Sequence, residues 1–502
     1  MNTLIAILQR VTRASRRMTV VALALGSAAC ASTGGLHTHA HLTDVATIHA
    51  SRSLQGTPLS AAAWPDGAWW EQFGDEQLDG VVDHALSSQP RLRVAEARVR
   101  AAEAIAGIAG APLYPHVNAR AGSERERFSE HGTVPPPIAG TWQTINNASL
   151  GVDYELDFWG KNRAAVNAAL DRVHASQVDL QAARLMLSVA VVQTYLRLDS
   201  AYRLRDLLRD TLAQRQKILA LTRARVAAQV DSNLELTEAE AALPATREQL
   251  EATGATIALL RNQIAALEGE GPDAGLSLQR PRLAARGAMR IPSNLPIDLI
   301  GRRPDVVAQR WRVEAARQDI KVARAEFYPD ISLNAFVGLQ RLGFGQFLSM
   351  GSRVLGVGPA ISLPLFEGGR LRGNLALHQA VYDAAVERYN GAVLGALHDV
   401  VDQLTALTWI DRQQREQIQA VQLSQHAYDL ATARYRNGLA DYLQVLVADG
   451  QVLAQKRRQI LLDEHRRALR VDLIRALGGG YAPASPAAQA GATLSRVSGA
   501  SR

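Results

Sequence analysis

The sequence predicts a mixed fold of α and β, mostly α, in which a segment of about 200 residues occurs twice. Three observations support this prediction. Aromatic residues make up only 5% of the 502 residues and hydrophobic residues 47%, rich in Ala and Leu, a mixture that favours long helices. Short motifs recur in one order at nearly constant spacing. Within each copy the hydrophobic pattern changes from a helical period to alternation and back.

The N-terminus has the pattern of an export signal over residues 1–29. A basic region ends at Arg17, an apolar segment covers residues 20–25, and small residues lead to Cys30. Four of the seven surplus positive charges lie in this basic region, so the formal charge of +7 does not predict a nucleic-acid partner. We therefore expect the mature protein to leave the cytoplasm.

Cys30 is the only cysteine, which excludes an intrachain disulfide. Its place after the signal is typical of a lipid-modified cysteine, although Ser27 stands where lipoproteins usually carry Leu; cleavage nearby, with an inert thiol, is the alternative. Residues 30–63 are expected to form an extended tether. The histidines there could bind a metal on one side of an extended chain or belong to a solvated linker; they are His37, His39 and His41.

Three pairs of motifs define the repeat. Leu113-Tyr114-Pro115 is echoed by Phe327-Tyr328-Pro329 at an offset of 214. Residues 156–163 (LDFWGKNR) are echoed by residues 363–370 (LPLFEGGR) at an offset of 207. Residues 225–231 correspond to residues 434–440 at an offset of 209. The same order at nearly the same spacing indicates two copies of one structural unit.

Each copy contains a predicted pair of strands, near residues 115–157 and 329–365. Apolar side chains occupy alternate positions from Ala148 to Phe158, with acidic or small residues between them. The second copy repeats this pattern over residues 355–365. Strands of about ten residues fit a tilted bilayer crossing, and two soluble hairpins with one wet face are the alternative.

Loops suited to a surface join each strand pair, over residues 122–145 and 341–353. No stretch of 18 apolar residues follows the signal, so a membrane crossing would have to use a β-barrel. Four strands cannot close a barrel, because about eight are the practical minimum. A membrane location therefore requires several copies, and three would supply twelve strands.

Long helices are predicted between the strand pairs, over residues 162–221, 233–267, 369–434 and 442–477. A helix of ~60 residues would be ~90 Å long, which is too long for one globular domain. Apolar residues at spacings of three and four predict packing against other helices, as in a coiled coil. Pro244 predicts a kink or break in the second helix.

Over residues 64–480 the chain resembles the TolC-like outer membrane factors, and most closely the NodT-type lipoproteins that serve resistance-nodulation-division (RND) pumps. Four motifs carry the resemblance: residues 156–163 (LDFWGKNR), 302–306 (RRPDV), 327–329 (FYP) and 363–370 (LPLFEGGR). The resemblance implies a homotrimer with a twelve-stranded transmembrane β-barrel in the bacterial outer membrane and a long α-helical barrel in the periplasm. It also implies a periplasmic adaptor protein, an inner-membrane RND transporter, and export of small molecules or drugs through a passive channel.

The predicted organisation follows from the repeat and the resemblance. It comprises a signal peptide (1–29), a tether (30–63), a first repeat (64–267), a connecting equatorial segment (268–300), a second repeat (301–480) and a disordered C-terminal tail (481–502).

The residues of interest in such a channel line its wall and its closed end. Asp153, Glu155 and Asp157 lie on the polar side of a strand, where a lumen is expected; pairing with Arg120 or other cations is the alternative. The resemblance puts the periplasmic gate at Leu443, Gln444 and Val447, where better-known members have carboxylates at the last two positions. This departure predicts closure by an apolar constriction, with ordinary helix packing as the alternative.

No catalytic residue, cofactor or metal is predicted. Gly160-Lys161 lacks the upstream glycine of a phosphate loop, because Glu155 occupies that position, and Glu464-His465 lacks the second histidine of a zinc-protease helix. Two non-enzymatic alternatives stay open beside the efflux channel. One is the outer-membrane duct of a type I protein secretion system, and the other is a coiled-coil scaffold lipoprotein that forms no channel.

Overall fold

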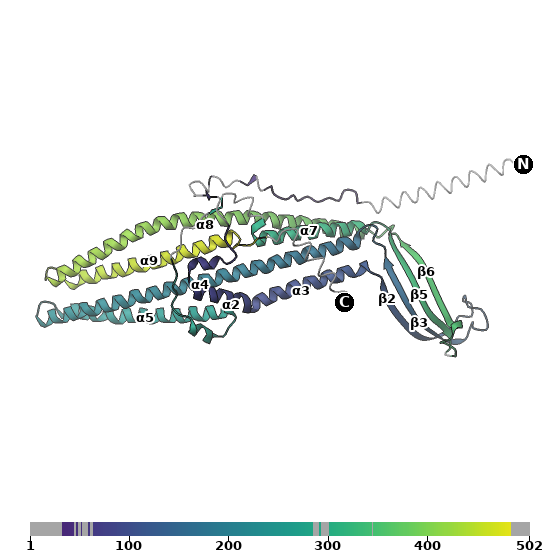
Figure 1. Ribbon diagram of the computed structural model, residues 1–502, viewed down its shortest axis with the longest axis horizontal. Helices are drawn as coiled ribbons and strands as arrows, with labels where there is room; N and C mark the ends of the chain where they lie inside the picture. The colour runs from purple at the N-terminus through teal and green to yellow at the C-terminus, as the bar shows by residue number, and fades with distance from the viewer. Residues whose placement is uncertain are drawn as a thin grey trace. The chain divides into compact units, whose positions relative to one another are not determined.

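The computed structural model describes residues 33–44, 47–48, 52, 59–60, 64–284, 291–292, 301–343 and 345–482 (Figure 1). The predicted signal peptide, Cys30 and nearly all of the predicted C-terminal tail lie outside the described residues. The chain divides into two compact units. The sheet unit takes its described residues from 1–42, 98–176 and 309–389, and the helical unit takes them from 43–97, 177–308 and 390–502.

The sheet unit contains one antiparallel sheet of four strands in the order β2-β3-β5-β6. The strands are β2 (His116–Arg127), β3 (Trp142–Glu155), β5 (Asp330–Leu342) and β6 (Arg353–Ser362), and they lie side by side in Figure 1. The unit also holds α7 (Pro304–Ala325) from residue 309 on and parts of three helices: α3 (Pro90–Gly110), α4 (Lys161–Ala227) and α8 (Arg370–Arg436). The two predicted strand pairs are thus confirmed, and they join into a single sheet.

The register of the sheet separates the side chains into two faces. Val152 pairs with Val117 and with Ala335, and Ala335 pairs with Val357, so apolar residues of all four strands share one face, here called the apolar face. Asp153 pairs with His116 and Asn334, which places the polar residues on the opposite polar face. Large apolar side chains of the apolar face are exposed in the protomer, including Val117, Leu150, Val337, Leu355 and Val357.

The strands differ from their predicted limits at both ends. β2 continues past Ala121 to Arg127, because its ladder with β3 persists where the side chains are polar on both faces. β3 ends at Glu155, so Asp157 and Phe158 lie beyond it. The alternation of apolar and polar residues, which continues to Phe158, therefore extends beyond the last hydrogen-bonded residue of the strand.

The helical unit contains two long helical hairpins and their supports. Its elements are α2 (Glu76–Ser88), α5 (Asn233–Glu268), α9 (Tyr442–Ala476), the remaining parts of α3, α4, α7 and α8, and a short parallel pair of β1 (Leu59–Ser60) with β4 (Ile291–Pro292). Apolar side chains from α2, α4, α5 and α9 form its main core around Leu78, Tyr195 and Ile264. The predicted long helices are confirmed, and α4 and α8 each have 67 residues.

The repeat predicted from the motifs is present in the elements themselves. The starts of β2 and β5 have the same offset of 214 as the first pair of motifs, and the ends of β3 and β6 have the same offset of 207 as the second pair. α4 and α8 have an offset of 209 at both their first and their last residues. The offset changes between strands and helices because the connection from β6 to α8 is slightly longer than the connection from β3 to α4. Each compact unit draws on both repeats.

Pro244 does not break α5, which runs from Asn233 to Glu268 without interruption. The prediction of a break is wrong because the neighbouring residues Ala242, Leu243 and Thr246 are buried and hold the helix in place, while Pro244 lies on the exposed side. The carbonyl of Glu240, which loses its helical donor, can therefore bind water. Among the described helices, none is both long enough and apolar enough to cross a membrane.

Candidate functional site

The polar face of the sheet carries two of the predicted acidic residues. The carboxylate of Asp153 accepts a 2.8 Å hydrogen bond from the side-chain amide of Asn118 on β2. The carboxylate of Glu155 lies 2.6 Å from Nζ of Lys161. Neither pairs with Arg120. The alternative of pairing with a cation therefore describes Glu155, whereas Asp153 is exposed and bonded only to a neutral group within the part of the chain that the structure describes.

Asp157 was expected on the same strand as Asp153 and Glu155, and this placement is wrong because β3 ends at Glu155. That Asp157 faces a lumen stays a prediction. Its carboxylate accepts hydrogen bonds from the backbone N–H groups of Asn162 (3.1 Å) and Arg163 (2.9 Å) at the start of α4. The guanidinium of Arg163 adds a 3.1 Å ion pair. Burial raises the pKa of Asp157, but these hydrogen bonds lower it more, so the pKa lies below its ordinary value. The residue stabilises the N-terminus of a 67-residue helix.

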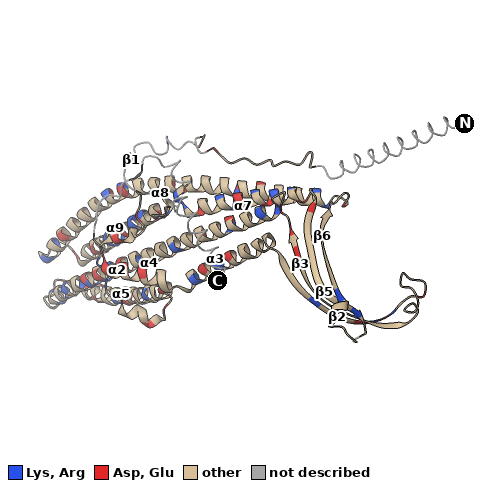
Figure 2. Ribbon diagram, turned by 45° about the vertical axis from the view of Figure 1, so that its right-hand side comes forward, with Lys and Arg blue, Asp and Glu red and all other residues tan. Residues whose placement is uncertain are grey.

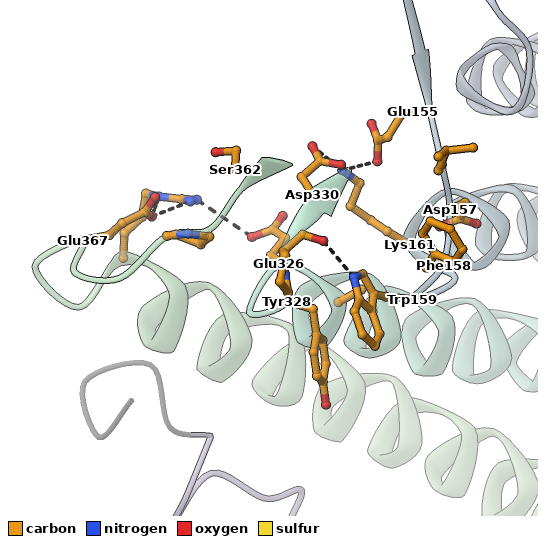
Figure 3. A pocket seen from close by; sticks show the side chains of 15 residues that line it. Glu155, Asp157, Phe158, Trp159, Lys161, Glu326, Tyr328, Asp330, Ser362 and Glu367 are labelled. Atoms are coloured by element: carbon orange, nitrogen blue, oxygen red, sulfur yellow. Dashed lines mark hydrogen bonds and ion pairs between the residues drawn. The ribbon is translucent and has the colours of Figure 1, made fainter. Parts of the chain in front are cut away.

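A hollow of about 270 Å³ lies where the strands meet the helices of the sheet unit (Figure 3). Lys161 reaches Glu155 and, at 3.8 Å, Asp330 from the other repeat. Burial lowers the pKa of Lys161, but the Glu155 hydrogen bond and nearby carboxylates raise it more, so the lysine stays charged. Trp159 stacks on Tyr328, with ring centres 4.7 Å apart, and its indole N–H donates to the carbonyl of Pro329 at 2.7 Å.

These contacts join the two repeats, since Lys161 and Trp159 belong to the first and the residues they contact at 328–330 to the second. The cations that line the hollow have carboxylate partners, because Arg370 pairs with Glu367 at 2.5 Å and lies 3.8 Å from Glu326. An arrangement of matched charges and stacked rings fixes the base of the sheet.

The two helical hairpins of the helical unit end in matching turns. The N–H of Val230 donates to the carbonyl of Arg225 at 2.9 Å, and at the equivalent position of the second repeat the N–H of Leu439 donates to the carbonyl of Arg434 at 2.8 Å. Gln229 and Gly438 occupy the same position in the two turns, with φ of 60° and 73°. Glycine accepts this left-handed backbone without strain, whereas Gln229 adopts it at a cost.

A network of four side chains ties the two turns together. Arg225 holds the carboxylate of Asp231 with two hydrogen bonds of 2.8 and 2.9 Å. Tyr435 of the second hairpin donates to the same carboxylate at 2.5 Å and lies 2.9 Å from the hydroxyl of Thr222. The Arg225 hydrogen bond lowers the pKa of Asp231 despite its burial, and burial together with the Asp231 hydrogen bond raises the pKa of Tyr435 to about 12.

The sequence did not predict this network, although Arg225, Asp231 and Tyr435 lie in the repeated segments 225–231 and 434–440. The signal is a difference between the repeats: Asp231 in the first turn corresponds to Ala440 in the second. Arg434, the counterpart of Arg225, donates instead to the backbone carbonyl of Leu439 at 3.4 Å. The two copies are therefore specialised, and only the first provides the acidic centre.

The predicted gate residues lie in the first turns of α9. Leu443 is 53% exposed and Val447 58% exposed, while their neighbours Tyr442 and Val445 are buried in the hairpin core. The backbone N–H of Gln444 donates to the N-cap carboxylate of Asp441 at 3.2 Å. Packing within the protomer thus does not account for Leu443 and Val447, which form an apolar pair one helical turn apart on the exposed side.

The three N-terminal histidines lie in the sheet unit. The rings of His37 and His39 are 4.6 Å apart, and the backbone N–H of His39 donates to the carboxylate of Asp383 on α8 at 3.1 Å. Within the described ranges, no group of three or more His, Cys, Asp or Glu side chains is arranged to hold a metal ion. Within the predicted tether, His39 and Ala40 are thus in contact with α8.

Comparison with known proteins gives a consistent result. The family model described as "Outer membrane efflux protein" matches residues 81–270 and 295–479. The fusaric acid resistance protein FusA of Burkholderia cepacia is 38% identical over 376 residues, covering 74% of this chain and 70% of that protein. The multidrug resistance outer membrane protein MdtP of Escherichia coli is 31% identical over 431 residues, covering 84% of this chain and 88% of MdtP.

Solved structures agree with this result. The outer membrane protein VceC of Vibrio cholerae superposes with a TM-score of 0.78 at 35% identity and covers 83% of this chain and all of its own. The outer-membrane channel OprN superposes with a TM-score of 0.79 at 27% identity over 90% of this chain and 99% of OprN.

Proposed function

The chain belongs to the outer membrane efflux protein family, and from this premise we propose that three copies assemble into one continuous passive duct. Members of this family form the outer-membrane component of tripartite efflux systems, and the protein serves that function. The observation that carries the trimer is the four-stranded sheet. One of its faces is apolar yet exposed, and both edge strands lack a second neighbour within the described protomer.

Open edges are costly in a membrane, because each unpaired backbone group there costs several kcal/mol. Pairing β6 of one copy with β2 of the next removes every edge once the ring closes. Three copies give twelve strands, and β2 and β6 have 12 and 10 residues, enough to cross a bilayer at a tilt. The apolar face then contacts lipid, and the polar face with Asp153 and Glu155 lines the lumen.

The tips of the helical hairpins form the closed periplasmic end in this proposal. Leu443 and Val447 from three copies converge into an apolar ring, which excludes water and ions when narrow. The side chain of Gln444 is uncharged, so the ring contains no carboxylate at this position and binds cations weakly. The exposure of both apolar residues in the single protomer supports this assignment, because an apolar surface of this kind is covered in a functional assembly.

A periplasmic adaptor and an inner-membrane RND transporter complete the proposed system and open the tips. The relatives are named for resistance to fusaric acid and to multiple drugs, which supports small organic molecules as the exported class. This favours efflux over the type I protein secretion alternative. A lipid on Cys30 anchors the chain at the outer membrane. Further along the predicted tether, the backbone N–H groups of His39 and Ala40 donate to the carboxylate of Asp383 on α8.

Single-channel conductance of the detergent-extracted protein in planar bilayers tests the proposal, with native mass spectrometry of the same sample. We expect discrete conductance steps and a complex of three protomers. A monomer that is released without detergent and gives no conductance would contradict the duct and favour the scaffold alternative. Intact mass of the membrane-extracted protein, against a Cys30→Ser variant, tests the lipid independently.

A further inference from the structure

Arginines occupy the apolar face of the sheet at its loop end. Arg125 on β2 pairs in register with Thr144, Arg341 on β5 with Asn146, and Arg353 on β6 with Leu339. All three therefore point to the same side as Leu150 and Val337, and Figure 2 shows basic residues on the strands close to the hairpin loops. A fourth arginine, Arg127, lies opposite Trp142 on this face.

The arginines begin where the apolar residues end. On β5 the apolar face carries aliphatic side chains from Ile331 to Leu339, followed by Arg341. These eight steps cover about 27 Å along the strand, and a tilt of about 40° reduces this to about 20 Å of membrane thickness, close to the roughly 25 Å apolar band of transmembrane barrels. Arg125 and Arg353 lie near Arg341 in the register of the sheet. Their pairing partners, Thr144 and Leu339, are each two residues along the strand from Asn146 and Arg341.

The positive charge of this row is largely uncompensated. Arg127 pairs with Glu130 at 2.9 Å, but Arg125, Arg341 and Arg353 form no ion pair within the part of the chain that the structure describes. The nearest acidic residues of β2, Glu124 and Glu126, alternate onto the polar face, where the sheet separates them from the arginines. Arg125 and Arg353 are exposed and Arg341 is half-buried, and guanidinium groups in such positions suit bidentate binding of phosphate.

We propose that Arg125, Arg341 and Arg353 bind the phosphate groups of the glycolipid that forms the outer leaflet, at the boundary between hydrocarbon and headgroup. The inference rests on the proposed function, because the barrel places this end of the strands at the outer surface. In a trimer nine such arginines surround the barrel. Opposite charge and headgroup depth argue together for a phosphorylated lipid as the occupant.

The test uses the full-length protein in nanodiscs of phosphatidylcholine that contain either bisphosphorylated lipid A or the same lipid without phosphates. Lipid A that stays with the protein after detergent purification is counted per protomer by mass spectrometry. We expect the triple variant Arg125→Gln, Arg341→Gln, Arg353→Gln to retain about one fifth or less of the lipid A that the unchanged protein retains. With the dephosphorylated lipid, we expect a smaller difference between the two proteins.

Arg120→Gln is the matched control for Arg125→Gln, because both arginines lie exposed on β2 but on opposite faces. Equal retention by the triple variant, or an equal loss in Arg120→Gln, overturns the proposal. Displacement of lipid A by 10-fold excess inorganic phosphate would identify a free-anion site and also overturn it. Conductance of the same samples distinguishes failure of the lipid site from failure of the duct. If the samples form channels but the triple variant retains as much lipid A as the unchanged protein, only the lipid site is rejected. If no channels form, the duct and the lipid site are rejected together.

Discussion

Tyr435 donates a 2.5 Å hydrogen bond to Asp231, so a helix of the second repeat holds the turn of the first. The carboxylate is also bound by two guanidinium nitrogens of Arg225, whose Nη1 donates to the backbone carbonyl of Tyr435 at 2.8 Å. The two hairpin tips are thus linked through one acidic group. Because the second repeat has Ala440 at the matching position, the link cannot be formed from the other side.

Asp231→Ala should loosen the tips and raise the conductance of the closed channel. It leaves Arg225 and Tyr435 without their shared partner in a largely buried site, a change that costs about 1.5–3 kcal/mol for a hydrogen-bonded charged group. The measurement is single-channel recording of the reconstituted protein. Glu240→Ala is the control, because Glu240 pairs with Arg223 on an exposed surface and should leave conductance unchanged. Equal currents from Asp231→Ala and the unchanged protein would refute the link.

The same network should depend on pH in a defined direction. The pKa of Asp231 is lowered in the folded protein, so its contribution to stability is full above the unfolded value of about 3.9 and is lost as pH falls through the folded value. The pKa of Tyr435 is raised to about 12, so its contribution is full below about pH 10 and is lost as pH rises toward 12. Chemical denaturation should show the destabilisation by Asp231→Asn to be smaller at pH 3 than at pH 7. A pH-independent difference would contradict the assignment.

Gly479→Ala should destabilise the helical unit. Gly479 has φ of 57°, and an added Cβ would collide with the side chain of Leu185. Strain and overpacking together cost about 2–4 kcal/mol, which should lower the midpoint of thermal unfolding. Gly254→Ala is the matched control: it lies within α5 with open space around it, and we expect a gain of about 0.5–1 kcal/mol. If Gly479→Ala unfolds at the temperature of the unchanged protein, Gly479 is not constrained.

Leu443→Ser combined with Val447→Ser should raise the closed-state conductance, because hydroxyl groups let water into an apolar constriction. Leu259→Ser on α5, where Leu259 is 68% exposed, controls for the loss of a surface leucine and should have no effect. Planar-bilayer recording at fixed voltage provides the comparison. If the double variant conducts like the unchanged protein, the constriction lies elsewhere.

The strand limits and the role of Asp157 could not be predicted from alternation alone. Alternation continues through Phe158, yet β3 ends at Glu155 because the chain turns toward α4 and Asp157 binds the first N–H groups of that helix. The pattern records which side a residue faces, whereas the end of a strand depends on hydrogen-bond partners contributed by distant parts of the chain. Pro244 illustrates the same limit, since neighbouring buried side chains keep α5 continuous.

The repeat, the long helices and the two-faced strand pairs could be predicted from the sequence, because they depend on local periodicity within single segments of the chain. Three features became apparent only in the folded chain: the two strand pairs join through β3 and β5, Lys161 bridges the repeats, and Asp231 bonds Tyr435. The last two contacts join side chains from different repeats, far apart along the chain. Side-chain chemistry permits many such pairings, and only the packing of the folded chain selects among them.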